Sequence, residues 1–455
     1  MVQRSIPLAG YRGVTARACV RVGDHVQCGQ LIGVPEAPGS VPVHASDAGE
    51  VIRVTADSVV IDGSPQALHP SACTVTLPPG SVADRVRDSG LVGMGGAGYP
   101  TAQKLASTGI HTLILNAVEC EPLIEQNAAE ITRDARAVLF GLRYAASLLG
   151  ATTLIAAVKP SRPELGAALT RAAAQLGMGL DVRTVSDDYP AGDHRAVIRD
   201  ALGTLLPVDA RSSSIGVSVV NVETMLRVER AVTAGHPVIT TDLTVTAPDF
   251  GPQVVRDVPV GTHLVDLCEA LGVTIPPAAQ VLVDGPFMGR RVELDAVVTK
   301  TTGGVIIAPA PQAHPEPVGL IVCACGASEQ RMRQWAAERG APVVAVEHCA
   351  NAVPVGGGLR CKNPGVCPGQ AKAVISARKA GAQELLIGHC VDCTNTVMRV
   401  APAMGLTVHH TSDDALAVAG MPPMRGGHAA TPASPSGTHP APQAHPAPQA
   451  VHPHA

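Results

Sequence analysis

A glycine-rich run in this chain could bind a phosphorylated ligand. The run, GMGGAGYPTAQKL, extends from Gly93 to Leu105 and contains a lysine at position 104. Its glycines let the backbone approach a ligand closely at positive φ, and the N–H groups of a following helix would point at an anion. The four residues with this freedom are Gly93, Gly95, Gly96 and Gly98. Lys104 adds a positive charge, so the run predicts a phosphate-binding loop rather than a plain surface turn.

Cysteines form the second set of chemically capable residues. Five of the twelve, Cys19, Cys28, Cys73, Cys120 and Cys268, are scattered through the first three hundred residues. The other seven are crowded together in the next part of the chain: Cys323, Cys325, Cys349, Cys361, Cys367, Cys390 and Cys393. Such crowding is more often metal-binding or catalytic than structural when no secretory signal is evident.

The glycine run lies in a segment that alternates helix and strand, residues 80 to about 230. Leu113–Leu115 and Thr153–Val158 read as buried strands, and Ser161 with Glu164 predicts a capping box that opens a helix. This alternation indicates an α/β layer, whose ligands bind at the carboxyl ends of the strands. Asn116 follows the first of these strands, where a cofactor contact is expected.

The clustered cysteines belong to a second α/β pattern, in which three apolar strands end in cysteine. These ends would lie along one edge of a parallel sheet, so we expect the thiols to converge there. Cys390 and Cys393 form a CxxC at a strand-to-helix turn, where a helix N-terminus favours the thiolate. We therefore predict that this pair is a catalytic dithiol with an exposed, acidic first thiol, Cys390.

A metal site is the alternative for the same region. Cys323, Cys325, Cys349, Cys361 and Cys367 could hold an iron–sulfur cluster or zinc. Metal sites usually show paired CxxC spacings, and this chain has one CxxC and one CxC. The dithiol interpretation is therefore preferred, and both remain open.

Composition sets further bounds. The chain has 455 residues, 46% of them hydrophobic and 2% aromatic, with a formal net charge of −4. A length of this kind predicts about three domains, and the charge gives no reason to expect nucleic acid. Apolar stretches fall short of the ~20 residues needed to span a bilayer. We expect a cytoplasmic protein that reaches a membrane, if at all, through a partner.

Three motifs together resemble the flavin-carrying subunit of respiratory complex I and its relative RnfC, of Rnf electron-transport complexes. They are the glycine run, NAVECEP from Asn116 and NVET from Asn221; YPAGDHRAVIRDALG from Tyr189 favours the RnfC branch. The resemblance implies FMN as cofactor and NADH as donor. It implies cofactor contacts at Gly93, Gly95, Gly96, Gly98, Lys104, Asn116, Glu119, Asp193, Asn221 and Thr224.

The resemblance also implies a multidomain α/β fold class. We expect an RnfC-type barrel-sandwich hybrid over residues 1–75, a complex I-like flavin domain over 80–232 and an SLBB β-grasp domain over 237–308. A proline-rich linker over 309–318, a cysteine-rich α/β redox domain over 319–424 and a disordered tail over 425–455 complete the chain. The CxxCxxCxxxCP runs of RnfC proteins are missing after the linker.

The domain order is similar to that of PrdC, the electron-transfer protein of D-proline reductase. The predicted function is an oxidoreductase that passes electrons from a nicotinamide through FMN to the CxxC domain and on to a partner reductase, with D-proline reductase as a candidate. Two alternatives are an Rnf-like or cobalamin-reductase-like subunit with an iron–sulfur cluster, and a non-catalytic scaffold with a degenerate flavin pocket.

Overall fold

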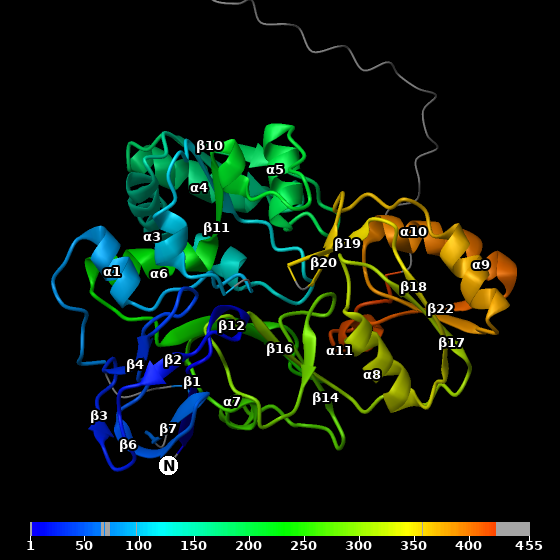
Figure 1. The fold of residues 1–455 in the computed structure, drawn as a ribbon, viewed down its shortest axis with the longest axis horizontal. Helices are drawn as coiled ribbons and strands as arrows, with labels where there is room; N and C mark the ends of the chain where they lie inside the picture. Colours follow the sequence, from blue (N-terminus) through cyan, green and yellow to red (C-terminus); the bar gives the residue numbers. More distant parts are fainter. Residues whose placement is uncertain (1, 65–67, 69–72, 97, 357, 425–455) are drawn as a thin grey trace, which may run out of the picture.

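The computed structural model describes residues 2–64, 68, 73–96, 98–356 and 358–424 (Figure 1). The tail that the sequence predicts to be disordered, 425–455, lies outside these residues. The described chain forms an N-terminal β unit, an α/β unit, a mixed β unit and a C-terminal α/β unit. Figure 1 shows the first α/β unit above the two β units, with the C-terminal unit on the other side of the molecule.

The N-terminal unit contains two small antiparallel sheets, ordered β1-β7-β6-β3 and β2-β4-β5. Burial alternates along β1, and Ile6, Ile32 and Ile61 meet in a common core. Period-two burial of this kind is what pairs short strands into a sandwich. The strands are β1 (Gln3–Pro7), β2 (Ala16–Ala18), β3 (His25–Val26), β4 (Leu31–Pro35), β5 (Val43–His44), β6 (Gly49–Val54) and β7 (Ser58–Asp62), with a 3-10 turn η1 (Tyr11–Gly13).

The first α/β unit is a parallel sheet ordered β10-β9-β8-β11, with helices on both faces. Its strands are β8 (Thr112–Asn116), β9 (Thr153–Val158), β10 (Asp181–Thr184) and β11 (Val217–Asn221). One face is covered by α1 (Val82–Asp88), α2 (Thr101–Leu105), α3 (Gln126–Leu149), α4 (Pro163–Gln175) and α6 (Val222–Thr233). The other face is covered by α5 (His194–Leu202), and η2 (Ser212–Ile215) precedes β11.

The capping box predicted for Ser161 and Glu164 is wrong. Helix α4 begins at Pro163, and Arg162 occupies the N-cap position without a side-chain cap. The Ser161 hydroxyl instead donates to Oδ1 of Asp187 at 2.5 Å. A tertiary contact with a neighbouring loop has therefore displaced the local cap.

The third unit is a five-stranded sheet ordered β13-β12-β16-β14-β15, covered by one helix. Strands β12 and β16 run parallel, and the other pairs are antiparallel. The elements are β12 (Thr240–Thr246), β13 (Gln253–Pro259), α7 (Leu264–Ala270), β14 (Gln280–Val283), β15 (Arg290–Val292) and β16 (Gly304–Ala308). They lie within the residues expected for the SLBB domain, whose family assignment stays a prediction.

The C-terminal unit is a second parallel sheet, ordered β18-β17-β21-β22. Its helices α9 and α10 pack on one face and α8 on the other. A hairpin, β19–β20, projects from it beside α5 of the first α/β unit (Figure 1). The elements are β17 (Val318–Val322), α8 (Glu329–Arg339), β18 (Val343–His348), β19 (Ala352–Val355), β20 (Gly358–Cys361), α9 (Ala371–Lys379), β21 (Glu384–Ile387), α10 (Val391–Val400), η3 (Pro402–Met404), β22 (Thr407–His410) and α11 (Asp413–Val418).

Two buried arginines join the units. The guanidinium of Arg331 on α8 donates to the backbone carbonyls of Pro286 and Gly289, each at 2.8 Å. Arg195 on α5 donates to the carbonyls of Cys361 and Lys362 in the hairpin region. Carbonyl groups buried at a domain contact need such donors, so these arginines fix where the cysteine-rich unit sits.

None of the helices within the described ranges has both the length and the hydropathy required of a membrane span.

Candidate functional site

The glycine loop lies between α1 and α2 and is held from below by α6. The Met94 N–H donates to the Thr224 hydroxyl at 3.0 Å. A Cβ at Gly95 would come within 3.0–3.3 Å of the Asn221 side chain, so this close approach requires glycine. Gly96 has φ +92° and faces open space, which leaves its backbone available to a ligand.

Lys104 lies on α2 immediately behind this loop. Its ammonium group is buried and donates to the carbonyl of Val219 on β11. Burial lowers its pKa to about 8. Within the described residues it makes no ion pair with a carboxylate, and a buried cation without a counter-charge is costly. An anionic ligand group at the loop would remove that cost, so the residues present fit the phosphate of FMN.

Asn221 and Asn116 shape the loop's surroundings rather than the open space itself. Asn221 is the N-cap of α6, and its Oδ1 accepts from the Thr224 N–H at 3.2 Å. Asn116 ends β8, and its Nδ2 donates to the Gly192 carbonyl at 3.0 Å. Both amides hold the backbone around the loop, and neither lines the cavity described below.

The two carboxylates predicted to contact cofactor act as helix caps. Glu119 accepts from the N–H groups of Asn127 and Ala128 at the start of α3, and burial raises its pKa to about 7. Asp193 accepts from the N–H groups of Arg195 and Ala196 at the start of α5. Asp193 also lines the cavity, whereas Glu119 does not.

A cavity of about 490 Å³ opens between the glycine loop and the cysteine-rich unit. Gly95 and Gly96 line it on one side, and Cys325 and Cys361 line it on the other. Its volume is in the usual range for a cofactor pocket. Flavin loop and thiols, which are more than two hundred residues apart in the sequence, therefore face the same space.

Glu121 is a cavity residue that the sequence analysis did not single out. It lies in the NAVECEP stretch, and its two carboxylate oxygens accept from the N–H groups of Phe287 and Met288 at 2.7 and 2.8 Å. Burial raises its pKa to about 7. The signal was present in the motif, but its partners in the third unit could not be inferred from spacing.

The thiols converge as the strand-end pattern predicts. Cys323 and Cys325 follow β17, Cys349 follows β18, and Cys390 follows β21, the three strands being neighbours. The thiols of Cys325 and Cys349 donate hydrogen bonds to Cys323, which lowers the pKa of Cys323. Cys325 also contacts Cys361 and Cys390 through its thiol.

Cys367 and Cys393 form a separate pair beside this chain of thiols. The Cys393 thiol donates to Cys367, which lowers the pKa of Cys367 to about 6. Cys393 itself has a strongly raised pKa for the same reason and because it is buried. The pairing brings all seven clustered cysteines into one core, together with Val374 and Ile387.

The expectation that Cys390 is exposed is wrong. Cys390 is the N-cap of α10, at the predicted strand-to-helix turn, but only 4% of it is exposed and only 2% of Cys393. The hairpin and α9 cover the turn, so its accessibility was decided by tertiary packing. The catalytic role of the two residues stays a prediction.

Comparison with known proteins identifies the first half of the chain. Residues 2–69 match the RnfC barrel sandwich hybrid domain, and residues 86–230 match the Nuo51 FMN-binding domain. The chain is RnfC-like. The expected hybrid, the flavin domain and FMN as its cofactor are thereby confirmed.

Curated relatives agree with this assignment. The RnfC protein of the ion-translocating oxidoreductase complex of Pseudomonas aeruginosa is 30% identical over 341 residues, covering 70% of this chain and 44% of that protein. Its counterpart in Serratia proteamaculans is 31% identical over 351 residues, covering 71% and 49%. In Erwinia tasmaniensis the counterpart is 33% identical over 337 residues, covering 67% and 40%. The RnfC-like chain spans about half the length of the curated relatives it matches.

A solved structure of an NAD⁺-reducing [NiFe]-hydrogenase in the air-oxidised state is 25% identical to this chain. It covers 50% of this chain and 46% of its own, with a TM-score of 0.43. At that score the superposition adds nothing to the assignment of the RnfC-like fold.

Proposed function

We propose that this RnfC-like protein transfers electrons from a reduced nicotinamide, through FMN, to the cysteine-rich unit and on to a partner reductase. The shared cavity carries the proposal, because the flavin loop and the thiols of Cys325 and Cys361 line one space. FMN, when bound, supplies the two-electron chemistry. The curated relatives are members of ion-translocating oxidoreductase complexes, which supports a partner protein.

The chain's own residues divide the work. Gly95, Gly96 and Lys104 would hold the cofactor at the cavity, and Lys104 would neutralise its phosphate. On the opposite wall, two thiols exchange with a disulfide: closing an S–S bond releases two electrons and two protons, and reducing it takes them up. Cys325 lies between Cys323, Cys361 and Cys390, so electron pairs can move along the chain of thiols by disulfide exchange.

The geometry favours this dithiol relay over a metal centre in the cysteine core. The thiol contacts join Cys349 to Cys323, Cys323 to Cys325, and Cys325 to Cys361 and Cys390. They form a branched chain rather than a set in which three sulfurs all contact one another. Where three ligand atoms do lie within 4.8 Å of each other, in the part of the chain described, they belong to other residues.

The test uses the full chain loaded with FMN, with its thiols oxidised, under anaerobic conditions. Addition of NADH or NADPH should bleach the flavin, and new free thiols, counted by alkylation and mass spectrometry, should follow. Cys361→Ser should leave the bleaching intact and reduce the thiol yield, whereas the exposed Cys19→Ser should change neither. Bleaching without any new thiol would reject the relay.

Cys390→Ser separates the two halves of the proposal. Flavin reduction should persist in this variant, and transfer to an added acceptor should stop. D-proline reductase is the acceptor to assay first, since the domain order is similar to that of PrdC. Preserved transfer would place Cys390 off the electron path.

An iron–sulfur protein is the second candidate function, because seven cysteines gather in one core. Iron and sulfide in the purified protein, together with a cluster absorbance lost in Cys323→Ser, would favour it. A colourless protein that takes up no flavin would favour a scaffold instead.

A further inference from the structure

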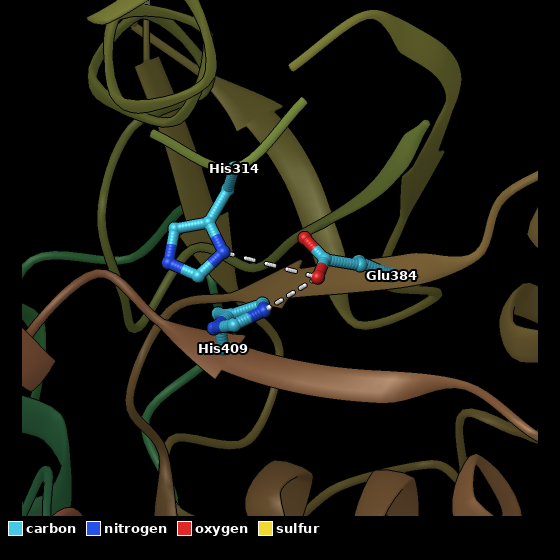
Figure 2. A group of neighbouring side chains, drawn as sticks. All are labelled: His314, Glu384 and His409. Carbon is cyan, nitrogen blue, oxygen red and sulfur yellow. Dashed lines mark ion pairs between the residues drawn. The ribbon is translucent and has the colours of Figure 1, made fainter. Parts of the chain in front are cut away.

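A group of three metal-ligating side chains lies away from both the cavity and the cysteine core. His314 belongs to the linker before β17, Glu384 begins β21 and His409 lies on β22 (Figure 2). One ligand atom from each lies within 4.8 Å of the other two. Figure 2 shows the Glu384 carboxylate between the two imidazole rings.

The distances suit a small cation. Nε2 of His409 is 3.3 Å from Oε1 of Glu384, and Nδ1 of His314 is 4.0 Å from the same oxygen. Zinc bonds of about 2.0–2.1 Å to nitrogen and oxygen, at a tetrahedral angle, separate two ligands by about 3.3–3.4 Å. One pair already has this spacing. The His314 side chain is 36% exposed, so it has room for the small rotation that the other pair needs.

Hydrogen bonding does not satisfy these groups. Among the described residues, Nε2 of His409 and Oε2 of Glu384 are buried without a hydrogen-bond partner. Buried polar atoms normally have one, so each such atom in a folded protein calls for an explanation. A cation held by both imidazoles and the carboxylate would supply it.

The surroundings hold the three ligands in place. The Trp335 ring lies beside both imidazoles, with centroid separations of 6.1 Å to His314 and 5.5 Å to His409. The Arg339 guanidinium stacks on the same indole, but its charge is paired with Asp414. The backbone is fixed too: the His314 N–H donates to the Arg339 carbonyl at 2.9 Å, and the Glu384 N–H donates to the Pro317 carbonyl at 3.1 Å.

We propose that His314, Glu384 and His409 bind a divalent transition-metal ion, with Zn²⁺ as the preferred ion. Two imidazoles and one carboxylate select this class over Mg²⁺ or Ca²⁺, which prefer oxygen ligands. A cavity of about 360 Å³ beside His314 leaves room for water at the fourth position. The ion would clamp the linker to two strands of the sheet and so fix the entry into the cysteine-rich unit.

The test measures Zn²⁺ binding to the full chain by competition with a chromophoric chelator. His409→Ala and His314→Ala should each lose one equivalent of zinc, or bind it at least tenfold more weakly. His348→Ala is the matched control, because His348 pairs with Glu329 at 3.3 Å on the same unit without a third ligand. Histidines beyond residue 424 are unchanged in all variants, so their binding cancels.

Two further measurements keep the outcome decisive. Co²⁺ at this site should show no thiolate charge-transfer band, which distinguishes it from Co²⁺ on the cysteines. Zinc should raise the Tm of the unaltered chain and of His348→Ala but not of His314→Ala, with all three alike in EDTA. Equal stoichiometry and affinity in His314→Ala and His348→Ala, or a lost equivalent that carries the thiolate band, would overturn the proposal.

Discussion

Lys104 is the residue on which flavin binding depends most directly. Lys104→Met should weaken FMN binding by about 1–3 kcal/mol, the scale for losing a hydrogen bond to a charged group. Fluorescence titration of the apoprotein with FMN measures this. Lys379→Met, an exposed change on α9, should leave the affinity unaltered. Equal affinities in the two variants would refute the role given to Lys104.

The lowered pKa of Lys104 adds a pH dependence to the same comparison. Because burial lowers this pKa to about 8, the free protein loses the lysine's proton above about pH 8, and FMN affinity should fall there. Lys104→Met should show no such fall. In the free protein the folded state binds fewer protons than the unfolded chain between about pH 8 and 10.5, so stability should rise with pH across that window and rise less in the variant.

Cys367 should be the most reactive thiol of the cysteine core. It is half-buried rather than buried, and the hydrogen bond from Cys393 lowers its pKa to about 6. Iodoacetamide at pH 7 should therefore label Cys367 before Cys390 or Cys393, as resolved by peptide mass spectrometry. Cys393→Ala removes the donor and should slow that labelling, while Cys268→Ala should not. Faster labelling of Cys390 would restore the order that the sequence alone predicts.

At the scale of elements, the sequence predicts the strand ends better than the helix starts. The cysteines that follow β17, β18 and β21 converge because parallel neighbouring strands share an edge, and this can be inferred from alternation alone. The start of α4 could not be inferred, because Ser161 bonds to Asp187, twenty-six residues away. Glu119 and Asp193 show the same limit: they were predicted as cofactor contacts, and their positions make them caps of α3 and α5.

Helix α6 should hold the glycine loop through one hydroxyl. Thr224→Val keeps the shape of the side chain but leaves the buried Met94 N–H without an acceptor. The free energy of unfolding should fall by about 1–3 kcal/mol, the cost of an unsatisfied buried donor. Chemical denaturation measures the fall, and FMN affinity should decrease with it. Thr224→Ser retains the hydroxyl and should preserve both; a loss as large as that in Thr224→Val would show that the methyl group, not the hydrogen bond, matters.

At the scale of the whole molecule, the cavity between flavin loop and thiols is the feature that sequence patterns could not predict. The motifs locate the loop within one unit and the cysteines within another, but their mutual placement depends on contacts such as Arg195 to Cys361 and Arg331 to Gly289. These are bonds to backbone carbonyls, which leave no signal in side-chain spacing. Arg195 does lie within the RnfC-like YPAGDHR string, where its role reads as local.

Arg195→Met should uncouple the two halves of the molecule. The variant removes donors from the carbonyls of Leu206, Cys361 and Lys362 and keeps much of the apolar stem. Each carbonyl left unsatisfied costs about 1–3 kcal/mol where it stays buried, so the hairpin should move away from α5 and widen the cavity. Flavin bound at the glycine loop should still be reduced at the normal rate, because that loop lies on the other wall. The appearance of thiols after flavin reduction should slow, as followed by rapid quench and alkylation. Arg333→Met, which removes an exposed ion pair on α8, is the matched control and should change neither step. Normal thiol formation in Arg195→Met would mean that electrons reach the cysteines by a route other than this cavity.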